Sequence, residues 1–364
     1  MMDGTTINQH DGPVMPLGES WPEIRESVAK ICEGFDNAYW MRLDDESAYP
    51  NEFVKALTDA GYLAVLIPEE FGGSGLPISA AGAVLETIHR TGCNAAACHA
   101  QMYTMGTVLR HGTDEQKQKY LPHIATGELR LQAFGVTEPT TGSDTTQLKT
   151  RAVRDGNQYV VNGQKVWTSR ALQSDLMLLL ARTTPADEVK RRSDGISVFL
   201  VDLREARGNG LDIRKLDAAI NHNTCEVFID NLKLAPDTLV GEEGRGFRYI
   251  LDGMNAERIL IAYESIGDAK FFIDKAVAYA NDRVVFGAPI GKNQGIQFPI
   301  ARAWAELQAA ELMVHKAAAL FEQGLDCGAE ANTAKMLASE AAWKAGEACM
   351  QTHGGFAFAK EYGI

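Results

Sequence analysis

The chain has 364 residues, of which 45% are hydrophobic and 23% charged, with 34 glycines and 12 prolines. This composition is typical of a globular protein and excludes a disordered chain, a collagen-like repeat and a small disulfide-rich fold. Lysine and arginine number 35 against 48 aspartates and glutamates, a formal net charge of −13, which argues against a polyanionic partner such as DNA. The length provides enough apolar material for a sizeable core in two or three domains.

The cysteines, the histidines and the lengths of the apolar runs indicate the compartment of the protein and whether it holds a metal or spans a membrane. The six cysteines form no CxxC pair, and the first twenty residues contain no apolar signal core. The eight histidines show no ligand spacing such as HExxH, so we expect no structural metal. The longest apolar runs, such as residues 176–181 and 196–201, are far shorter than the roughly 20 residues that a membrane span needs. We therefore expect a cytoplasmic protein without a membrane span.

Residues 20–128 are predicted to form an N-terminal helical domain. Phe53 and Leu57 begin an apolar series at three- and four-residue spacing, which is typical of a helix with one buried face. Residues 81–109 are rich in Ala, Met and Leu and predict two buried helices. Thr113, followed by two acidic residues, is a candidate N-cap for a further helix.

Residues 129–240 are predicted to form a middle antiparallel β domain. The segments 158–161 and 164–167 flank Asn162-Gly163, and Asn-Gly is the strongest two-residue signal for a hairpin. Further short runs rich in strand-forming residues lie at 176–181, 196–201 and 225–229. The charged segment 183–194 is predicted to be a surface loop.

Residues 241–364 return to a helical pattern. Long segments dense in Ala, Leu, Ile and Met lie at 253–282, 296–323 and 329–351. Helices of this length are predicted to pack as a C-terminal helical bundle. The fold class that follows is α+β, with helices, then strands, then helices.

Familiar nucleotide-binding and hydrolase motifs are missing from the sequence. There is no GxGxxG, no GxxxxGK[ST] and no GxSxG; residues 287–292 come near a phosphate-binding loop, but their spacing is wrong. A Rossmann, P-loop or α/β-hydrolase interpretation therefore has no support. Any cofactor must be held in another way.

Two segments of the β domain have an unusual composition. Residues 134–144 (FGVTEPTTGSD) place hydroxyls and glycines where a strand gives way to a loop, and residues 162–169 (NGQKVWTS) place a tryptophan beside two hydroxyls. Free backbone N–H groups and hydroxyls can bond a heteroaromatic ring, and a tryptophan can cover a flat cofactor. Each segment alone is better explained as a turn or as a core strand.

Together with residues 283–294 (RVVFGAPIGKNQ) and 351–355 (QTHGG), these segments resemble the acyl-CoA dehydrogenase family. The four blocks occur in family order, and the resemblance extends from about Tyr49 to Ile364. It implies a helical, a β and a second helical domain, with FAD between the β domain and the C-terminal helices. Family members continue past the equivalent of Ile364, so we expect the bundle to lack its last segment.

The resemblance implies flavin contacts for a first group of residues. Trp167 matches the residue that covers one face of the flavin, and Ser169 matches a hydroxyl residue near flavin N5 and O4. Ser143 also matches a position near the pantetheine of the substrate, and Phe134 stands where relatives commonly have a tyrosine. The whole group comprises Phe134, Val136, Thr137, Gly142, Ser143, Trp167 and Ser169.

A second group matches residues that hold the FAD pyrophosphate and adenine across a subunit boundary. This implies an oligomer, typically a homotetramer built as a dimer of dimers. Arg283 is a permanently charged bidentate donor suited to a pyrophosphate, although a surface ion pair with Asp282 would also explain it. The group comprises Arg283, Phe286, Gln294, Gln351, Gly354 and Gly355.

The family reaction is α,β-dehydrogenation of an acyl-CoA thioester, which needs a carboxylate to remove the α proton. Glu257 precedes Arg258 among apolar neighbours and resembles the base of isovaleryl- and long-chain-type members. Arg258 and Asn255 would then position the thioester end. Two alternatives stay open: a base beyond Ile364, where other members carry it, and a Glu257 paired with Arg258 or Lys270.

Other functions on the same scaffold stay open as well. Nitroalkane oxidases and flavin monooxygenases share this fold, and an aspartate base would favour the former. A homologue that binds acyl-CoA without flavin chemistry is the alternative from a different class. The resemblance implies electron-transferring flavoprotein as the electron acceptor, and the sequence does not predict the length or branching of the acyl chain.

Overall fold

Helices form the first part of the computed structural model, which describes residues 20–364. Phe53 and Leu57 are buried in α3, as predicted. Thr113 caps α6: Gln116 N donates to Thr113 Oγ1 at 3.2 Å, and Thr113 N donates to Gln116 Oε1 at 3.1 Å. The helices are α1 (Pro22–Cys32), α2 (Asn37–Asp45), α3 (Asn51–Asp59), α4 (Ile78–Arg90), α5 (Ala96–His111) and α6 (Asp114–Ala125).

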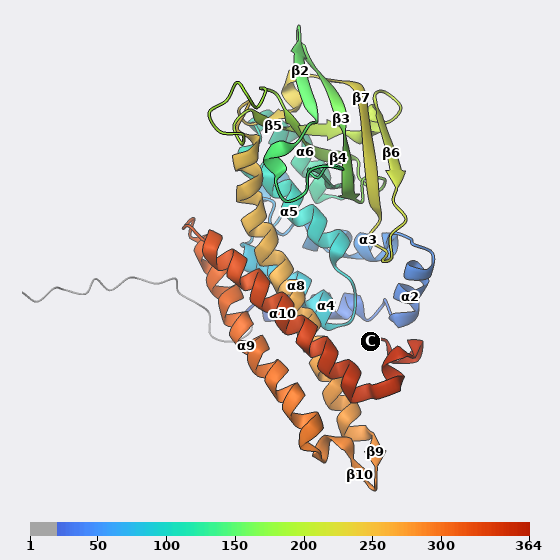
Figure 1. The fold of residues 1–364 in the computed structure, drawn as a ribbon. Coiled ribbons are helices and arrows are strands. Elements are labelled where there is room, and N and C mark those ends of the chain that lie inside the picture. The colour runs from blue at the N-terminus through green and yellow to red at the C-terminus, as the bar shows by residue number, and fades with distance from the viewer. Residues whose placement is uncertain (1–19) are drawn as a thin grey trace, which may run out of the picture.

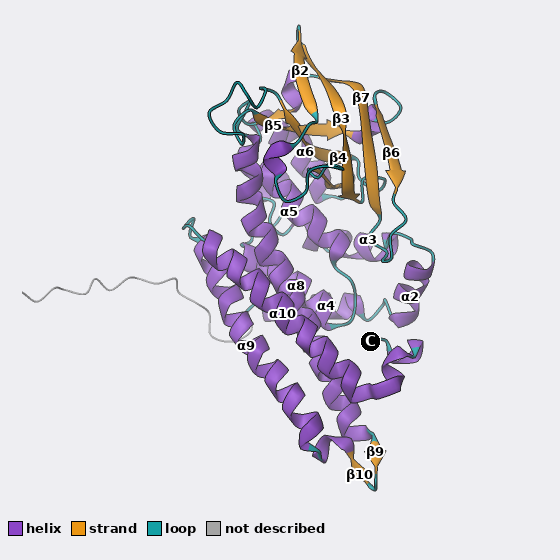
Figure 2. Cartoon of the chain, viewed as in Figure 1, coloured by secondary structure: helices purple, strands orange, loops and turns teal. Residues whose placement is uncertain are grey.

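A twisted sheet follows at one end of the molecule (Figures 1 and 2). Its order is β6-β7-β3-β2-β4-β5-β8, and β1 pairs with β4. The strands are β1 (Leu131–Gly135), β2 (Arg151–Asp155), β3 (Gln158–Ser169), β4 (Leu176–Arg182), β5 (Ile196–Asp202), β6 (Leu211–Lys215), β7 (Thr224–Leu234) and β8 (Leu239–Val240). A short helix, α7 (Leu203–Ala206), follows β5. The charged segment 183–194 joins β4 to β5 as a loop, as predicted.

Two predictions about the β domain were wrong. The sheet is mixed, because β1 and β2 run parallel to β4 while the other pairs are antiparallel. Asn162-Gly163 is not a turn but lies inside the continuous strand β3, and the hairpin turn is Gly156-Asn157 between β2 and β3. Pairing with β7 overrides the local turn preference, since Asn162 Oδ1 accepts from Asn231 N at 2.8 Å and the register shifts between Val161 and Gly163.

Both faces of the sheet are covered by apolar side chains. Along β4, Leu176, Leu178 and Leu180 join a cluster with α5 and α6, while Met177 and Leu179 join a cluster on the opposite face. This strand is buried on both faces, which explains its continuous apolar run. The sheet is thus fixed against the N-terminal helices, with β1 packed beside α5 and β5 beside α8.

Three long helices complete the fold and extend away from the sheet (Figure 1). They are α8 (Gly246–Asp282), α9 (Gln294–Glu322) and α10 (Gly328–His353), with the two-stranded ribbon β9 (Val284–Val285) and β10 (Ala288–Pro289) between α8 and α9. Helix α8 crosses α4 closely, because a Cβ at Gly267 would overlap the carbonyl oxygen of Glu86. In the described residues no helix is long and apolar enough to cross a membrane, and the six cysteines are free and buried.

Candidate active site

An ion pair inside the β domain joins the segment after β1 to strand β3. Lys165 Nζ lies 2.8 Å from Glu138 Oε1 and 3.1 Å from the carbonyl oxygen of Val136, and both charged side chains are buried. Glu138 also accepts from the backbone N–H groups of Lys149 and Thr150. Burial opposes its ionisation, but Lys165 and these N–H groups keep the pKa of Glu138 below its ordinary value. The loop is therefore fixed by this buried ion pair and these N–H groups, and the sequence did not single out Lys165.

This pairing brings Thr137 beside Trp167. Val166 N donates to the carbonyl oxygen of Thr137 at 2.9 Å. Trp167 has φ 60°, a left-handed conformation that is strained for a bulky residue, and it lies where the register of β3 and β7 shifts. Its side chain is 63% exposed although it follows the fully buried Lys165 by two residues. An exposed aromatic ring on a fixed, strained backbone offers a flat surface for a ligand.

The other predicted residues of this group surround the same strands. Phe134 and Val136 are half-buried at the end of β1, and Ser169 is half-buried where β3 ends. Gly142 and Ser143 are exposed in the loop between β1 and β2. The structure thus places the first group on the end of β1, in the loop that follows it and on the last part of β3, and β1 and β3 lie next to each other.

Glu257 is half-buried in α8, on the side of this helix that faces α5. Burial raises the pKa of the Glu257 carboxyl, while His99 and then Arg258 act in the opposite direction. The pairing with Lys270 does not occur, because Lys270 Nζ contacts Glu86 and Glu311, each at 2.7 Å. Arg258 Nη1 instead donates to Asn255 Oδ1 at 3.2 Å, which brings together the two residues predicted to position the thioester.

Aromatic rings connect the Glu257 region to strand β1. The rings of Tyr103 and Phe134 lie 6.2 Å apart, and the rings of His99 and Tyr103 lie 5.2 Å apart. Burial and then Glu257 raise the pKa of the Tyr103 hydroxyl, so this residue faces both the carboxylate and the end of β1. Glu257 therefore lies across Tyr103 from the first group of residues.

Sequence reasoning missed a buried pair next to Glu257. His99 Nδ1 lies 2.7 Å from Glu264 Oε1, and both side chains are buried. The two residues are 165 positions apart, and neither belongs to a recognisable motif. The one available signal was the seven-residue spacing between Glu257 and Glu264, which places both acids on one face of α8.

The second predicted group lies at the opposite end of the molecule from the sheet. Arg283 follows α8, Phe286 is fully exposed at the turn between β9 and β10, and Gln294 begins α9. Figure 1 shows this ribbon at the far tip of the bundle. The Arg283 guanidinium lies 5.7 Å from the ring centre of Phe356, next to Gly354 and Gly355, and in the described chain no ion pair joins it to Asp282. Gln351 is exposed in the last turn of α10.

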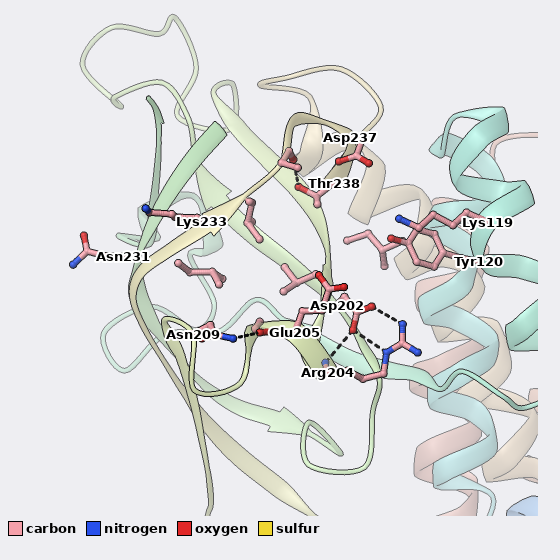
Figure 3. Close-up of a pocket in the computed structure, with 16 residues that line it drawn as sticks. Lys119, Tyr120, Asp202, Arg204, Glu205, Asn209, Asn231, Lys233, Asp237 and Thr238 are labelled. Atoms are coloured by element: carbon pink, nitrogen blue, oxygen red, sulfur yellow. Dashed lines mark hydrogen bonds and ion pairs between the residues drawn. The ribbon is translucent and has the colours of Figure 1, made fainter. Parts of the chain in front are cut away.

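A cavity of about 800 Å³ on the β domain takes no part in this arrangement (Figure 3). It lies between α6 and strands β5 and β7, and none of the predicted site residues lines it. Arg204 is paired with Asp202 there at 2.5 Å. The cavity therefore lies apart from the predicted site residues.

Comparisons with known proteins match this arrangement along the chain. Family models of acyl-CoA dehydrogenase domains match in order: the N-terminal domain over residues 19–128, the middle domain over 133–232 and the C-terminal domain over 244–364. An acyl-CoA dehydrogenase of Bacillus subtilis (strain 168) is 34% identical over 329 residues, which are 89% of this chain and 84% of that protein. The chain belongs to the acyl-CoA dehydrogenase family. It is an oxidoreductase of that family.

Solved structures share the fold of this chain. A glutaryl-coenzyme A dehydrogenase in complex with glutaryl-CoA has a TM-score of 0.87 and 30% identity, covering 96% of this chain and 88% of its own. PigA with FAD and proline has a TM-score of 0.87 and 26% identity, covering 95% and 90%. The α+β arrangement of helical, β and helical parts is therefore confirmed.

Proposed function

We propose that this chain catalyses the FAD-dependent α,β-dehydrogenation of an acyl-CoA thioester to the trans-2-enoyl-CoA, with Glu257 as the base. The observation that carries the proposal is the placement of Glu257. Its carboxyl is half-buried, its pKa is raised, and no ion pair in the described part of the chain involves it. A carboxylate with a pKa raised toward neutrality is suited to accept a proton from a weakly acidic C–H group.

The β-domain residues fit a flavin at this place. The exposed ring of Trp167 would cover one face, and Thr137, Val136 and Ser169 would bond or contact its edge. Thr137 and Trp167 are already held together by the Val166–Thr137 hydrogen bond, so little ordering is needed on binding. Bound FAD would supply the redox chemistry of the reaction.

The residues at the far tip fit the other end of FAD, bound to a neighbouring subunit. Arg283 would bond the pyrophosphate, and Gly354, with φ 61° and open space where a Cβ would stand, would let the backbone approach it. Phe286, Gln294, Gln351 and Gly355 would complete this group. We therefore infer an oligomer in which one chain completes the site of another, a homotetramer built as a dimer of dimers.

Substrate and partner follow from the same site. Asn255 and Arg258, joined by a hydrogen bond, would position the thioester, and Ser143 would contact the pantetheine. Electrons would pass to an electron-transferring flavoprotein in the cytoplasm. A nitroalkane oxidase or monooxygenase function is less well supported, because the half-buried carboxyl next to Tyr103 is a glutamate and the curated relatives include acyl-CoA dehydrogenases.

The direct test is an anaerobic titration of the purified holoenzyme with acyl-CoAs of short, long and branched chains, following the flavin absorbance. We expect at least one acyl-CoA to bleach the wild-type flavin. Glu257→Gln keeps the size of the side chain but cannot accept the proton, so it should bind the same acyl-CoA with at least about a hundredfold slower bleaching.

Each outcome of this titration decides a different point. Equal bleaching rates in both proteins would mean that Glu257 is not the base. Purified wild-type protein that contains no flavin would overturn the dehydrogenase proposal and favour a binding function.

A further inference from the structure

Arg170 is a buried cation at the end of the strand that carries Trp167 and Ser169. It directly follows Ser169, the last residue of β3, and is only 5% exposed. In the described part of the chain no hydrogen bond or ion pair involves its guanidinium. A buried charge without compensation is costly, so an anion that binds to Arg170 would relieve this cost.

The other buried lysines and arginines of the described residues all have partners within the chain. Arg25, Lys165 and Lys270 form ion pairs with glutamates. Arg182 donates to backbone carbonyl oxygens, two of them at 2.8 and 2.9 Å. Arg170 is therefore an exception, and the packing of the protein interior does not explain its charge.

Arg170 lines a cavity of about 270 Å³ between the end of α2, the first turn of α5 and the loop before β7. Among the described residues it is the one cation in the lining, and the one acid there, Asp44, is exposed on α2. Asn221 Nδ2 donates to the carbonyl oxygens of Leu43 and Ala48 at 2.9 and 2.8 Å. The wall of the cavity is thus fixed by bonds that leave Arg170 unpaired.

The backbone of Arg170 has a strained conformation. Its φ is 57°, in the left-handed region that a long side chain rarely adopts. Its N–H donates to the carbonyl oxygen of Asn223 at 2.8 Å, and Asn223 also lines the cavity. Such strain persists only where the surrounding structure holds it, and it is frequent at ligand-binding sites. The strained, unpaired Arg170 is therefore typical of a residue held in place for a ligand.

No group near Arg170 neutralises its charge. Burial lowers the pKa of Arg170, and Tyr49, Tyr103 and Glu264 act in the opposite direction, but an arginine stays protonated. The two tyrosines are uncharged near pH 7, because burial raises the pKa of both hydroxyls. Glu264 forms no ion pair with Arg170 in the described chain and lies 2.7 Å from His99 instead.

Helix α5 connects this cavity to the region of Glu257. Ala96 lines the cavity, and Tyr103 lies seven residues further on the same side of the helix, about 10 Å along its axis. The ring of Tyr103 lies 6.2 Å from that of Phe134 at the end of β1, and its hydroxyl is close enough to Glu257 for the carboxylate to raise its pKa. An acyl group with its α carbon at Glu257 would therefore reach Arg170 if its chain followed α5.

We propose that Arg170 binds a carboxylate at the far end of the acyl group, so that the preferred substrates are CoA thioesters of dicarboxylic acids. The inference rests on the proposed function, because it assumes an acyl group beside Glu257. A guanidinium bonds a carboxylate through two parallel N–H groups. One buried cation balances one negative charge, which suits a carboxylate better than a doubly charged phosphate. An acyl group that ends in a methyl group would leave Arg170 unpaired.

The test compares pairs of acyl-CoAs with equal numbers of carbons, from short to long chains. One member of each pair ends in a carboxylate and the other in a methyl group. Anaerobic bleaching of the flavin in the holoenzyme gives a rate and a half-saturating concentration for each compound. For at least one length we expect the ratio of these two quantities to favour the carboxylate by at least about a hundredfold, because a site built for a polar group rejects an analogue that lacks it.

Arg170→Met removes the charge and keeps a long, unbranched side chain. It should lower the preference for the carboxylate by at least about tenfold, whereas a structural defect would slow both members of a pair alike. The matched control is Arg204→Met, which removes an arginine from the lining of the other cavity and should keep the wild-type preference. If Arg170→Met loses its flavin, Arg170→Gln takes its place.

The stability of Arg170→Met is a second measurement. Because Arg170 has no partner in the described chain, the variant should be at least as stable as the wild type in urea denaturation. A large loss of stability would mean that Arg170 serves the fold and would overturn the proposal.

Binding separates this proposal from the dehydrogenase function. The same pairs are titrated by calorimetry into the Glu257→Gln holoenzyme, with and without Arg170→Met. If no acyl-CoA bleaches the wild-type flavin, the dehydrogenase proposal fails. The role of Arg170 then stands only if Arg170→Met weakens binding of the carboxylate-ended member alone, and it is overturned if both members bind as before.

Two further outcomes would overturn the substrate class while the dehydrogenase function stands. The first is equal bleaching by both members of every pair. The second is a free anion at Arg170: added acetate would then speed bleaching by methyl-ended acyl-CoAs in the wild type but not in Arg170→Met.

Discussion

Lys165 and Glu138 have side chains that are 0% and 4% exposed, so their charges depend on each other. Desolvation is expensive for both ions, and it lowers the pKa of Lys165 to about 8 despite the carboxylate. Such a pair adds little stability compared with apolar residues, but it strictly fixes which groups face each other. Here it fixes the loop that carries Thr137 against the strand that carries Trp167.

Removing one partner of the Lys165–Glu138 ion pair should lower the free energy of unfolding of the protein. Lys165→Met leaves Glu138 buried without its counter-charge, and we expect a loss of about 3–5 kcal/mol in the free energy of unfolding, measured by urea denaturation. We also expect a lower flavin content. The control is Lys344→Met, whose partner Glu306 is at the surface and whose loss should leave the free energy of unfolding close to that of the wild type. Equal stability of the two variants would contradict a structural role for Lys165.

Among the elements, α8 connects the parts of the site, and its position depends on glycine. At Gly267 a Cβ would overlap the Glu86 carbonyl oxygen and press on the side chain of His89. Gly267→Ala should therefore destabilise the protein by about 1–3 kcal/mol, because neither helix can move apart without loss of packing. Gly295→Ala in α9, where a Cβ would meet nothing within 4 Å, is the control and should be neutral or slightly stabilising. Both variants are measured by urea denaturation. If they lost the same free energy of unfolding, the close contact between α8 and α4 at Gly267 would be contradicted.

Helices and strands differed in how well the sequence predicted them. The helical periodicity around Phe53 and the cap at Thr113 were sufficient to predict helices α3 and α6, because both signals depend only on nearby residues. Asn162-Gly163 predicted a hairpin turn that does not form, because pairing with β7 decides the conformation at these residues. The parallel placement of β1 beside β4 has no local signal at all.

The candidate site residues also divide into those that a local sequence signal predicts and those that depend on contacts between distant parts of the chain. Trp167 and Glu257 were predicted as site residues because they lie in segments that resemble a family, and those predictions stand as proposals. Lys165 lies in such a segment too, but its role depends on Glu138, which is 27 residues away. His99 meets Glu264 only through the crossing of α5 and α8, and no pattern within either helix predicts that contact.

At the scale of the whole molecule, the second group of predicted FAD residues lies at the far tip of the helical bundle, away from the β domain that carries the first group (Figure 1). Exposed aromatic residues gather on the C-terminal helices and the ribbon: Phe286, Phe298, Trp304, Trp343 and Phe358. Large exposed apolar side chains in such number are typical of an interface between subunits. A single FAD could contact both groups only if a second chain supplied one of them.

This arrangement predicts complementation between two defective chains. Glu257→Gln and Arg283→Gln homo-oligomers should each be inactive, the first for lack of a base and the second for loss of flavin. In a mixed pair of chains, one site carries both substitutions and the other carries neither. Co-expression with separate tags, followed by tandem purification of mixed oligomers, should therefore restore activity, up to roughly half of the wild-type value per pair. If each site were built from one chain alone, every site in the mixture would carry a lesion, and the mixed oligomer would stay inactive.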